Sequence, residues 1–162
     1  MKTPKYKILV VGLGNPLRAD DGLGLKAIEI LKEESWTSEV LFLKIGTSPI
    51  NYLPQIKEAQ NIIVIDAIQG GKKTGSIYQL TLDNLNHQST EYVNAHSYSL
   101  PQVITLAKEI SNLPQKVLFY GLEPEDLSFN NHLSPSIKKN LPQLIKKIRK
   151  AIDYLIKQSP NY

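Results

Sequence analysis

The stretch Ile8-Leu9-Val10-Val11-Gly12-Leu13-Gly14-Asn15-Pro16-Leu17-Arg18-Ala19-Asp20-Asp21-Gly22 decides the fold of this 162-residue chain. Its first four residues form an apolar run that predicts a buried β-strand, and the periodic segment after the stretch predicts a helix. The two glycines at the strand end suit a sharp turn with close backbone approach. The adjacent carboxylates of Asp20 and Asp21 either cap the next helix or hold a cation at the edge of a sheet.

Apolar, β-rich runs alternate with helical patterns along the rest of the chain. Further strands are expected at Val40–Leu43, Asn61–Asp66, Ser76–Leu80 and Lys116–Gly121. Helices are expected at Leu23–Glu34, Pro49–Ala59 and Leu100–Ile110, and from Pro135 onward with Ser134 as the N-cap. Pro142 lacks a backbone donor, so it is expected to kink the last helix or divide it in two.

This alternation predicts an α/β fold. The strands are continuously apolar, which argues for a mostly parallel sheet covered on both faces, and right-handed crossovers limit the topology. We therefore expect a single-domain three-layer sandwich over residues 1–162, with helices on both faces of a twisted sheet of about five strands. The segment Gly71–Leu80 is expected to add an antiparallel edge, and residues 159–162 a frayed tail.

Composition narrows the functional class. No apolar run approaches the ~20 residues of a membrane span, and the N-terminus shows no secretory pattern. The chain has no cysteine, which excludes a thiol nucleophile and thiolate metal ligands. A cytoplasmic protein that binds neither membrane nor nucleic acid is expected. Although the net charge is +4, many lysines lie near the C-terminus, in a pattern typical of the solvated face of an amphipathic helix.

Three chemistry-bearing residues are predicted at strand ends or just ahead of a helix, where open α/β sheets form their sites. Asp21 follows the first strand, Asp66 ends the third, and His96 precedes the helix at Leu100–Ile110. Two carboxylates and an imidazole suit a divalent ion such as Ni²⁺, Zn²⁺ or Co²⁺, and Asp20 is a fourth candidate. Alternatively, the first carboxylates cap a helix, Asp66 accepts bonds from loop amides, and the histidine is solvated or capping.

The order of motifs resembles that of the nickel–iron hydrogenase maturation endopeptidases. The likeness begins with the glycine- and aspartate-containing stretch quoted above and continues through Val64-Ile65-Asp66-Ala67 and His96. It extends to Gly121-Leu122-Glu123-Pro124 and Leu133-Ser134-Pro135. This resemblance therefore spans nearly the whole chain.

The resemblance implies an aspartic-type endopeptidase that removes the C-terminal tail of a hydrogenase large-subunit precursor after nickel insertion. It places catalytic and nickel-interacting roles on Asp21, Asp66 and His96. Nickel would arrive with the substrate as the recognition signal, and zinc or cadmium could occupy the same site. A nearby carboxylate, Asp20 or Asp21, would serve as general base. The protein is expected to be a monomer or a weak oligomer.

One segment departs from the family pattern. The family often has an acidic Asp-Gly-Gly-Thr run after its second strand, whereas this chain has Lys44-Ile45-Gly46-Thr47. Gly46 and Thr47 remain candidate substrate-binding residues, or they form only a turn.

Three other functions share features of the sequence. Peptidyl-tRNA hydrolases also open with V-G-L-G-N-P, but the histidine that follows in that family is missing here. A dinucleotide-binding module lacks its third glycine, and the two carboxylates would repel a pyrophosphate. A non-catalytic escort of the nickel-loaded large subunit would use the same residues as the protease.

Overall fold

The computed structural model describes residues 3–87 and 99–158 and contains one five-stranded sheet. The strands β1 (Tyr6–Leu13), β2 (Val40–Gly46), β3 (Ala59–Ala67), β4 (Ile77–Thr81) and β5 (Lys116–Leu122) lie in the order β2-β1-β3-β5-β4. All neighbours are parallel except β4, which pairs antiparallel with β5 at one edge. The predicted α/β fold with a mostly parallel sheet and an antiparallel edge is confirmed.

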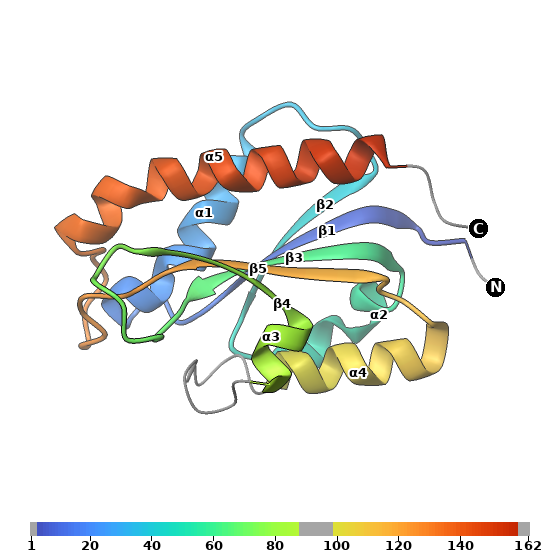
Figure 1. Ribbon diagram of the computed structural model, residues 1–162, viewed down its shortest axis with the longest axis horizontal. Helices are drawn as coiled ribbons and strands as arrows, with labels where there is room; N and C mark the ends of the chain where they lie inside the picture. The colour runs from blue at the N-terminus through green and yellow to red at the C-terminus, as the bar shows by residue number, and fades with distance from the viewer. Residues whose placement is uncertain (1–2, 88–98, 159–162) are drawn as a thin grey trace.

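Helices cover both faces of this sheet (Figure 1). One face carries α1 (Leu23–Lys32) and α5 (Pro135–Lys157), and the other carries α2 (Leu53–Ile56) and α4 (Ser99–Ser111). A short helix, α3 (Leu82–His87), follows β4, and two 3-10 turns, η1 (Ala19–Gly22) and η2 (Pro49–Tyr52), precede α1 and α2.

Several predicted boundaries were wrong. The strand expected to end at residue 43 continues to Gly46, and the helix expected at Pro49–Ala59 is a 3-10 turn followed by a single helical turn. The last helix is continuous through Pro142 rather than divided, since its buried apolar stripe packs along its whole length. The helix α3 was not predicted.

The core explains why the central strands are apolar without alternation. Successive side chains of a strand point to opposite faces. In β3, Ile63 and Ile65 pack with α1 and α5, whereas Ile62 and Val64 pack with α4. Both sets are fully buried. By the same period, Asp66 falls on the α4 side of the sheet.

Glycines bring the start of α1 directly onto the strand ends. A Cβ added to Gly24 would lie 2.4 Å from the carbonyl oxygen of Ile65 and 2.6 Å from that of Leu13. A Cβ on Gly12 would lie 2.4 Å from the carbonyl oxygen of Gly24. Only glycine permits this approach. It fixes the turn before α1, which contains Asp21, at the carboxyl ends of β1 and β3.

Candidate functional site at the carboxyl edge of the sheet

The ends of β2, β1 and β3 lie side by side at one edge of the sheet. In the strand register, Gly12 pairs with Ile65 and Leu13 pairs with Gly46. The Gly14 amide also donates to the Gly46 carbonyl, at 3.0 Å. The structure therefore brings three of the residues predicted for the site, Asp21, Gly46 and Asp66, to this one edge.

Asp21 lies in the η1 turn and is only 5% exposed. Its Oδ2 accepts a hydrogen bond from the Asn15 amide at 2.9 Å. The N-cap of α1 is Gly22, and no side chain caps this helix. The alternative that Asp21 caps the helix is therefore wrong, and its carboxylate instead binds the loop that leaves β1.

A glycine makes room for that loop. Gly14 has φ of 122°, and an added Cβ would lie 1.8 Å from the carbonyl oxygen of Asp21. This contact leaves no space for a side chain at position 14 while Asp21 keeps its place.

Asp66 is the penultimate residue of β3 and is 3% exposed. Its Oδ1 accepts a hydrogen bond at 2.8 Å from the amide of Ala67, the last residue of β3. Its strand partner in β5 is Gly121, where an added Cβ would lie 2.2 Å from the Asp66 carbonyl oxygen. A carboxylate withdrawn from water this far needs hydrogen-bonding or charged partners.

Asp20 has a different role from its neighbour. It is fully buried, and its carboxylate accepts four hydrogen bonds. The donors are the amides of Glu125 and Asp126, both at 2.9 Å, and the amide and hydroxyl of Ser134, at 2.7 and 2.8 Å. These bonds occupy both oxygens. Asp20 therefore ties the segment before α5 to the η1 turn, and these bonds make it poorly suited to the predicted role of metal ligand or general base.

Ser134 explains another difference from the prediction. It stands at the N-cap position of α5, but it makes no side-chain capping bond there. Its hydroxyl donates to Asp20 instead. A short sequence motif cannot reveal that a nominal cap residue is used by a distant carboxylate.

A fourth buried carboxylate, Glu123, follows β5 and, like Asp20, has a structural role. It accepts the amides of Gly70 and Gly71, at 2.8 and 3.2 Å, and the hydroxyl of Tyr78, at 2.6 Å. Burial and this hydrogen bond to Glu123 raise the pKa of Tyr78 to about 12. The network holds the turn after β3 against β4. No local sequence signal indicated that Glu123 and Tyr78 are partners in this network.

Of the other two predicted site residues, Thr47 and His96, the structure describes only Thr47. Thr47 is exposed and directly follows Gly46, whose φ is 70°. His96 lies outside the described residues. The helix α4 begins at Ser99, and its C-terminal end leads into the start of β5. The N-terminal end of α4 therefore points toward the edge of the sheet where the parallel strands end (Figure 1). Among residues 3–87 and 99–158, no cluster of three His, Asp or Glu side chains is arranged to hold a metal ion.

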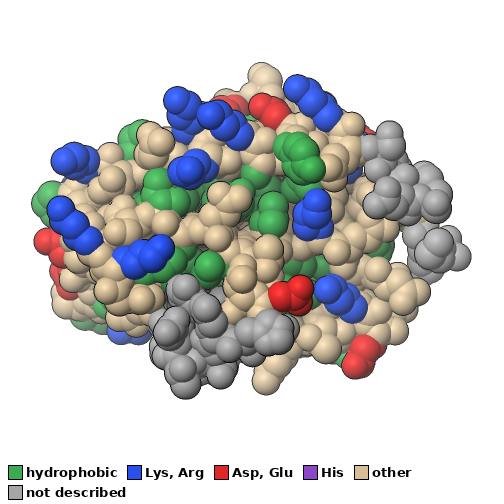
Figure 2. All heavy atoms as spheres, viewed as in Figure 1, with side chains coloured by type: hydrophobic (Ala, Val, Ile, Leu, Met, Phe, Trp, Pro, Cys, Tyr) green, Lys and Arg blue, Asp and Glu red, His purple; other side chains and the backbone are tan. Residues whose placement is uncertain are grey.

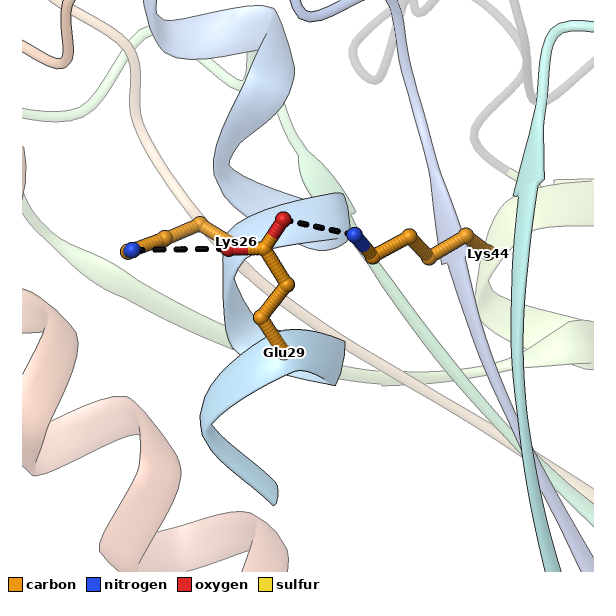
Figure 3. A network of polar contacts seen from close by, with 3 residues as sticks. All are labelled: Lys26, Glu29 and Lys44. Carbon is orange, nitrogen blue, oxygen red and sulfur yellow. Dashed lines mark hydrogen bonds and ion pairs between the residues drawn. The ribbon is translucent and has the colours of Figure 1, made fainter. Parts of the chain in front are cut away.

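Lys44, which stands where the family often has an acidic run, forms an ion pair. The Nζ of Lys44 lies 2.6 Å from Glu29 Oε1, and the Nζ of Lys26 lies 3.4 Å from Glu29 Oε2. Glu29, on α1, lies between Lys26 of the same helix and Lys44 of β2 (Figure 3). The hydrogen bond from Lys44 is the main cause that lowers the pKa of Glu29. The positive charge at position 44 is therefore compensated locally.

A concentration of basic side chains lies on the outer side of α5. The inward residues of this helix are buried, whereas lysines 138, 139, 146, 147, 150 and 157 are exposed. Figure 2 shows lysine and arginine side chains along the top of the molecule, where α5 lies in Figure 1, with hydrophobic side chains below them. The expected amphipathic helix is confirmed. No helix in the described part of the chain is long and apolar enough to cross a bilayer.

Comparisons with known proteins agree with this geometry. A family model described as hydrogenase maturation protease matches residues 25–151. The hydrogenase expression/formation protein HupD from Thiocapsa roseopersicina is 30% identical over 153 residues, which cover 92% of this chain and 67% of HupD.

Solved structures share the fold. The hydrogenase maturating endopeptidase HybD from E. coli superposes with a TM-score of 0.83 at 23% identity, covering 91% of this chain and 92% of HybD. The [NiFe] hydrogenase maturation protease HycI from Thermococcus kodakarensis KOD1 gives a TM-score of 0.75 at 27% identity, covering 94% of each chain.

Proposed function

Because the chain belongs to the hydrogenase maturation protease family, we propose that it removes the C-terminal tail of a nickel–iron hydrogenase large-subunit precursor after nickel insertion. The observation that carries this proposal is the placement of two nearly buried carboxylates, Asp21 and Asp66, at one edge of the sheet. Asp66 lies at the end of β3, and Asp21 lies in the η1 turn that follows β1. A site assembled in this way is suited to chemistry on a substrate held at the strand ends.

The proposed recognition step uses nickel that the precursor carries. Asp21, Asp66 and His96 would contact this ion, since two carboxylates and an imidazole form a mixed oxygen and nitrogen donor set suited to Ni²⁺. Zinc or cadmium would fit the same donors. Nickel is thus a feature of the substrate, and docking it at the edge would place the scissile peptide beside the carboxylates.

The proposed hydrolysis transfers a proton from water to a carboxylate. The water oxygen attacks the scissile carbonyl carbon, and the base later returns the proton to the leaving amine. Asp20 is unsuited as the base because both of its oxygens already accept hydrogen bonds. The base is therefore Asp21 or Asp66. Gly46 ends β2 and pairs with Gly14 of the loop that leaves β1, and Thr47 follows it; these two residues would contact the peptide backbone near the cleavage point.

The test compares nickel-loaded and nickel-free precursor. Each form is incubated with the protein, and the intact mass of the large subunit is measured over time. The proposal predicts loss of a C-terminal peptide from the nickel-loaded form alone. If the nickel-loaded precursor binds but keeps its full mass, the protein is an escort rather than a protease. If both forms are cleaved at equal rates, nickel is not the recognition signal.

A further inference from the structure

A groove of about 720 Å³ lies between α1 and α5, on the face of the sheet opposite α4. Its apolar lining comes from Leu25, Ile30, Leu133, Leu141, Pro142 and Ile145. At one end the groove is lined by Ala19 and Gly22 of the η1 turn. Asp21 lies between these two residues in the chain. The α1–α5 groove therefore adjoins the candidate site through a shared turn.

Two exposed hydrophobic side chains lie in loops that contribute to the groove lining: Leu17 follows Pro16, and Phe129 lies two residues before Asn131. Leu17 is 52% exposed and Phe129 is 83% exposed. Their loops are held together by a β-bridge between Arg18 and Asn130. Neither side chain belongs to the two core clusters. Hydrophobic surface next to an apolar groove is typical of a site where a partner docks.

The charge around the groove is positive. Glu29, in the groove wall, already binds Lys44 and Lys26, and Arg149 binds Glu34. Within the described part of the chain, Lys138 forms no ion pair, although it also lines the groove. The cations therefore outnumber the carboxylates at this rim, which favours a partner with acidic side chains.

We propose that the α1–α5 groove docks an apolar segment of the large-subunit precursor that is flanked by acidic residues. This inference rests on the proposed function, because it takes its partner from there. The apolar part of the segment fills the groove and covers Phe129, and an acidic residue pairs with Lys138. Docking here seats the precursor across the η1 turn, so that its C-terminal tail reaches the carboxyl edge of the sheet.

The test measures precursor affinity by biolayer interferometry and, separately, KM and kcat for tail removal. Lys138→Glu is compared with Lys139→Glu, a matched control because it makes the same charge change one residue outside the groove. We expect Lys138→Glu to weaken binding and raise KM about fivefold with kcat unchanged. Lys139→Glu should leave both values near those of the wild type.

A second pair of variants tests the apolar contact. Leu25→Ser and Phe129→Ser should each weaken binding about tenfold. Phe129 is so exposed that its replacement does not threaten the fold, and Ile110→Ser, on α4, is the matched exposed control. Thermal unfolding of every variant checks that the chain stays folded.

The outcomes separate this inference from the proposed function. Unchanged affinity in Lys138→Glu and Phe129→Ser overturns the docking inference, even if the wild type cleaves its precursor. A wild type that binds the precursor through these residues without cleaving it supports docking and overturns the protease. Sedimentation that shows a dimer abolished by Leu25→Ser identifies a second copy of the chain as the occupant, and so also overturns the inference.

Discussion

The amide and hydroxyl of Ser134 both donate to the carboxylate of Asp20, 114 positions earlier in the chain. This contact joins the start of α5 to the η1 turn that leads into α1. Asp21 is the next residue of that turn, so the same contact fixes the backbone that carries a proposed catalytic carboxylate. The site edge is thus held by a bond between two distant parts of the sequence.

Replacing Asp20 should destabilise the fold strongly. In Asp20→Asn, the side-chain NH₂ group faces backbone amides and a hydroxyl that are themselves hydrogen-bond donors. Buried hydrogen bonds are therefore lost. We expect the free energy of unfolding to fall by about 2–4 kcal/mol in a urea titration. Glu125→Gln, which changes an exposed carboxyl in the tethered segment, should stay within about 0.5 kcal/mol of the wild type. Equal stability of the two variants would show that the hydrogen bonds of Asp20 to the segment before α5 do not stabilise the fold.

Two glycine variants separate backbone strain from a steric clash. Gly14 and Gly71 both have positive φ, but only at Gly14 would an added Cβ meet backbone, the carbonyl oxygen of Asp21. No atom lies within 4 Å of a Cβ added at Gly71. Gly71→Ala should cost about 1–2 kcal/mol of unfolding free energy, from strain alone. Gly14→Ala should cost at least twice as much and should abolish tail removal, measured by urea unfolding and by product mass.

The raised pKa of Tyr78 predicts a loss of stability at high pH. The folded state favours the neutral phenol, so this contribution is complete below the ordinary pKa of about 10. It is lost as the pH rises from about 10 through the folded-state pKa of about 12. Absorbance at 295 nm should show a component with a midpoint near pH 12 that is absent in Tyr78→Phe. In Glu123→Gln, which removes the negative partner, this midpoint should fall. An unchanged midpoint would show that Glu123 does not help to raise the pKa of Tyr78.

His96 is predicted to be essential for processing. Replacing it by alanine should remove the imidazole donor and slow tail removal at least about 100-fold. The thermal unfolding midpoint should stay close to that of the wild type. His87→Ala is the matched control and should process the precursor normally. Near-normal cleavage by the His96 variant would remove this residue from the proposed site.

The fold was largely predictable because its signals are local. The run Ile62–Ile65 is apolar at every position, since both faces of β3 are covered, and this pattern can be recognised without knowledge of the partners. Strand ends in a parallel sheet meet at a common edge, so Asp21 and Asp66 could be expected near one another. The glycines at positions 12 and 14 also indicated a close approach at the first turn.

The errors came from interactions between distant residues. Nothing near Asp20 indicates that its four donors lie more than 100 positions away, and nothing near Ser134 indicates that its hydroxyl is already used. Pro142 does not divide α5, because the tertiary packing of the helix outweighs one lost backbone bond. Pro49 and Pro54 restrict the segment after β2 to short turns, a local effect that periodicity alone did not reveal.

The most direct test of the account concerns the two carboxylates at the sheet edge. Asp21→Asn and Asp66→Asn keep the side-chain size but remove the charge and the ability to accept a proton. Nickel-loaded precursor is incubated with each variant, with wild type and with the exposed control Glu109→Gln, and its intact mass is followed. We predict that wild type and Glu109→Gln remove the tail, whereas both aspartate variants, still folded, do so at least about 100-fold more slowly. Wild-type rates in either folded aspartate variant would contradict the central claim.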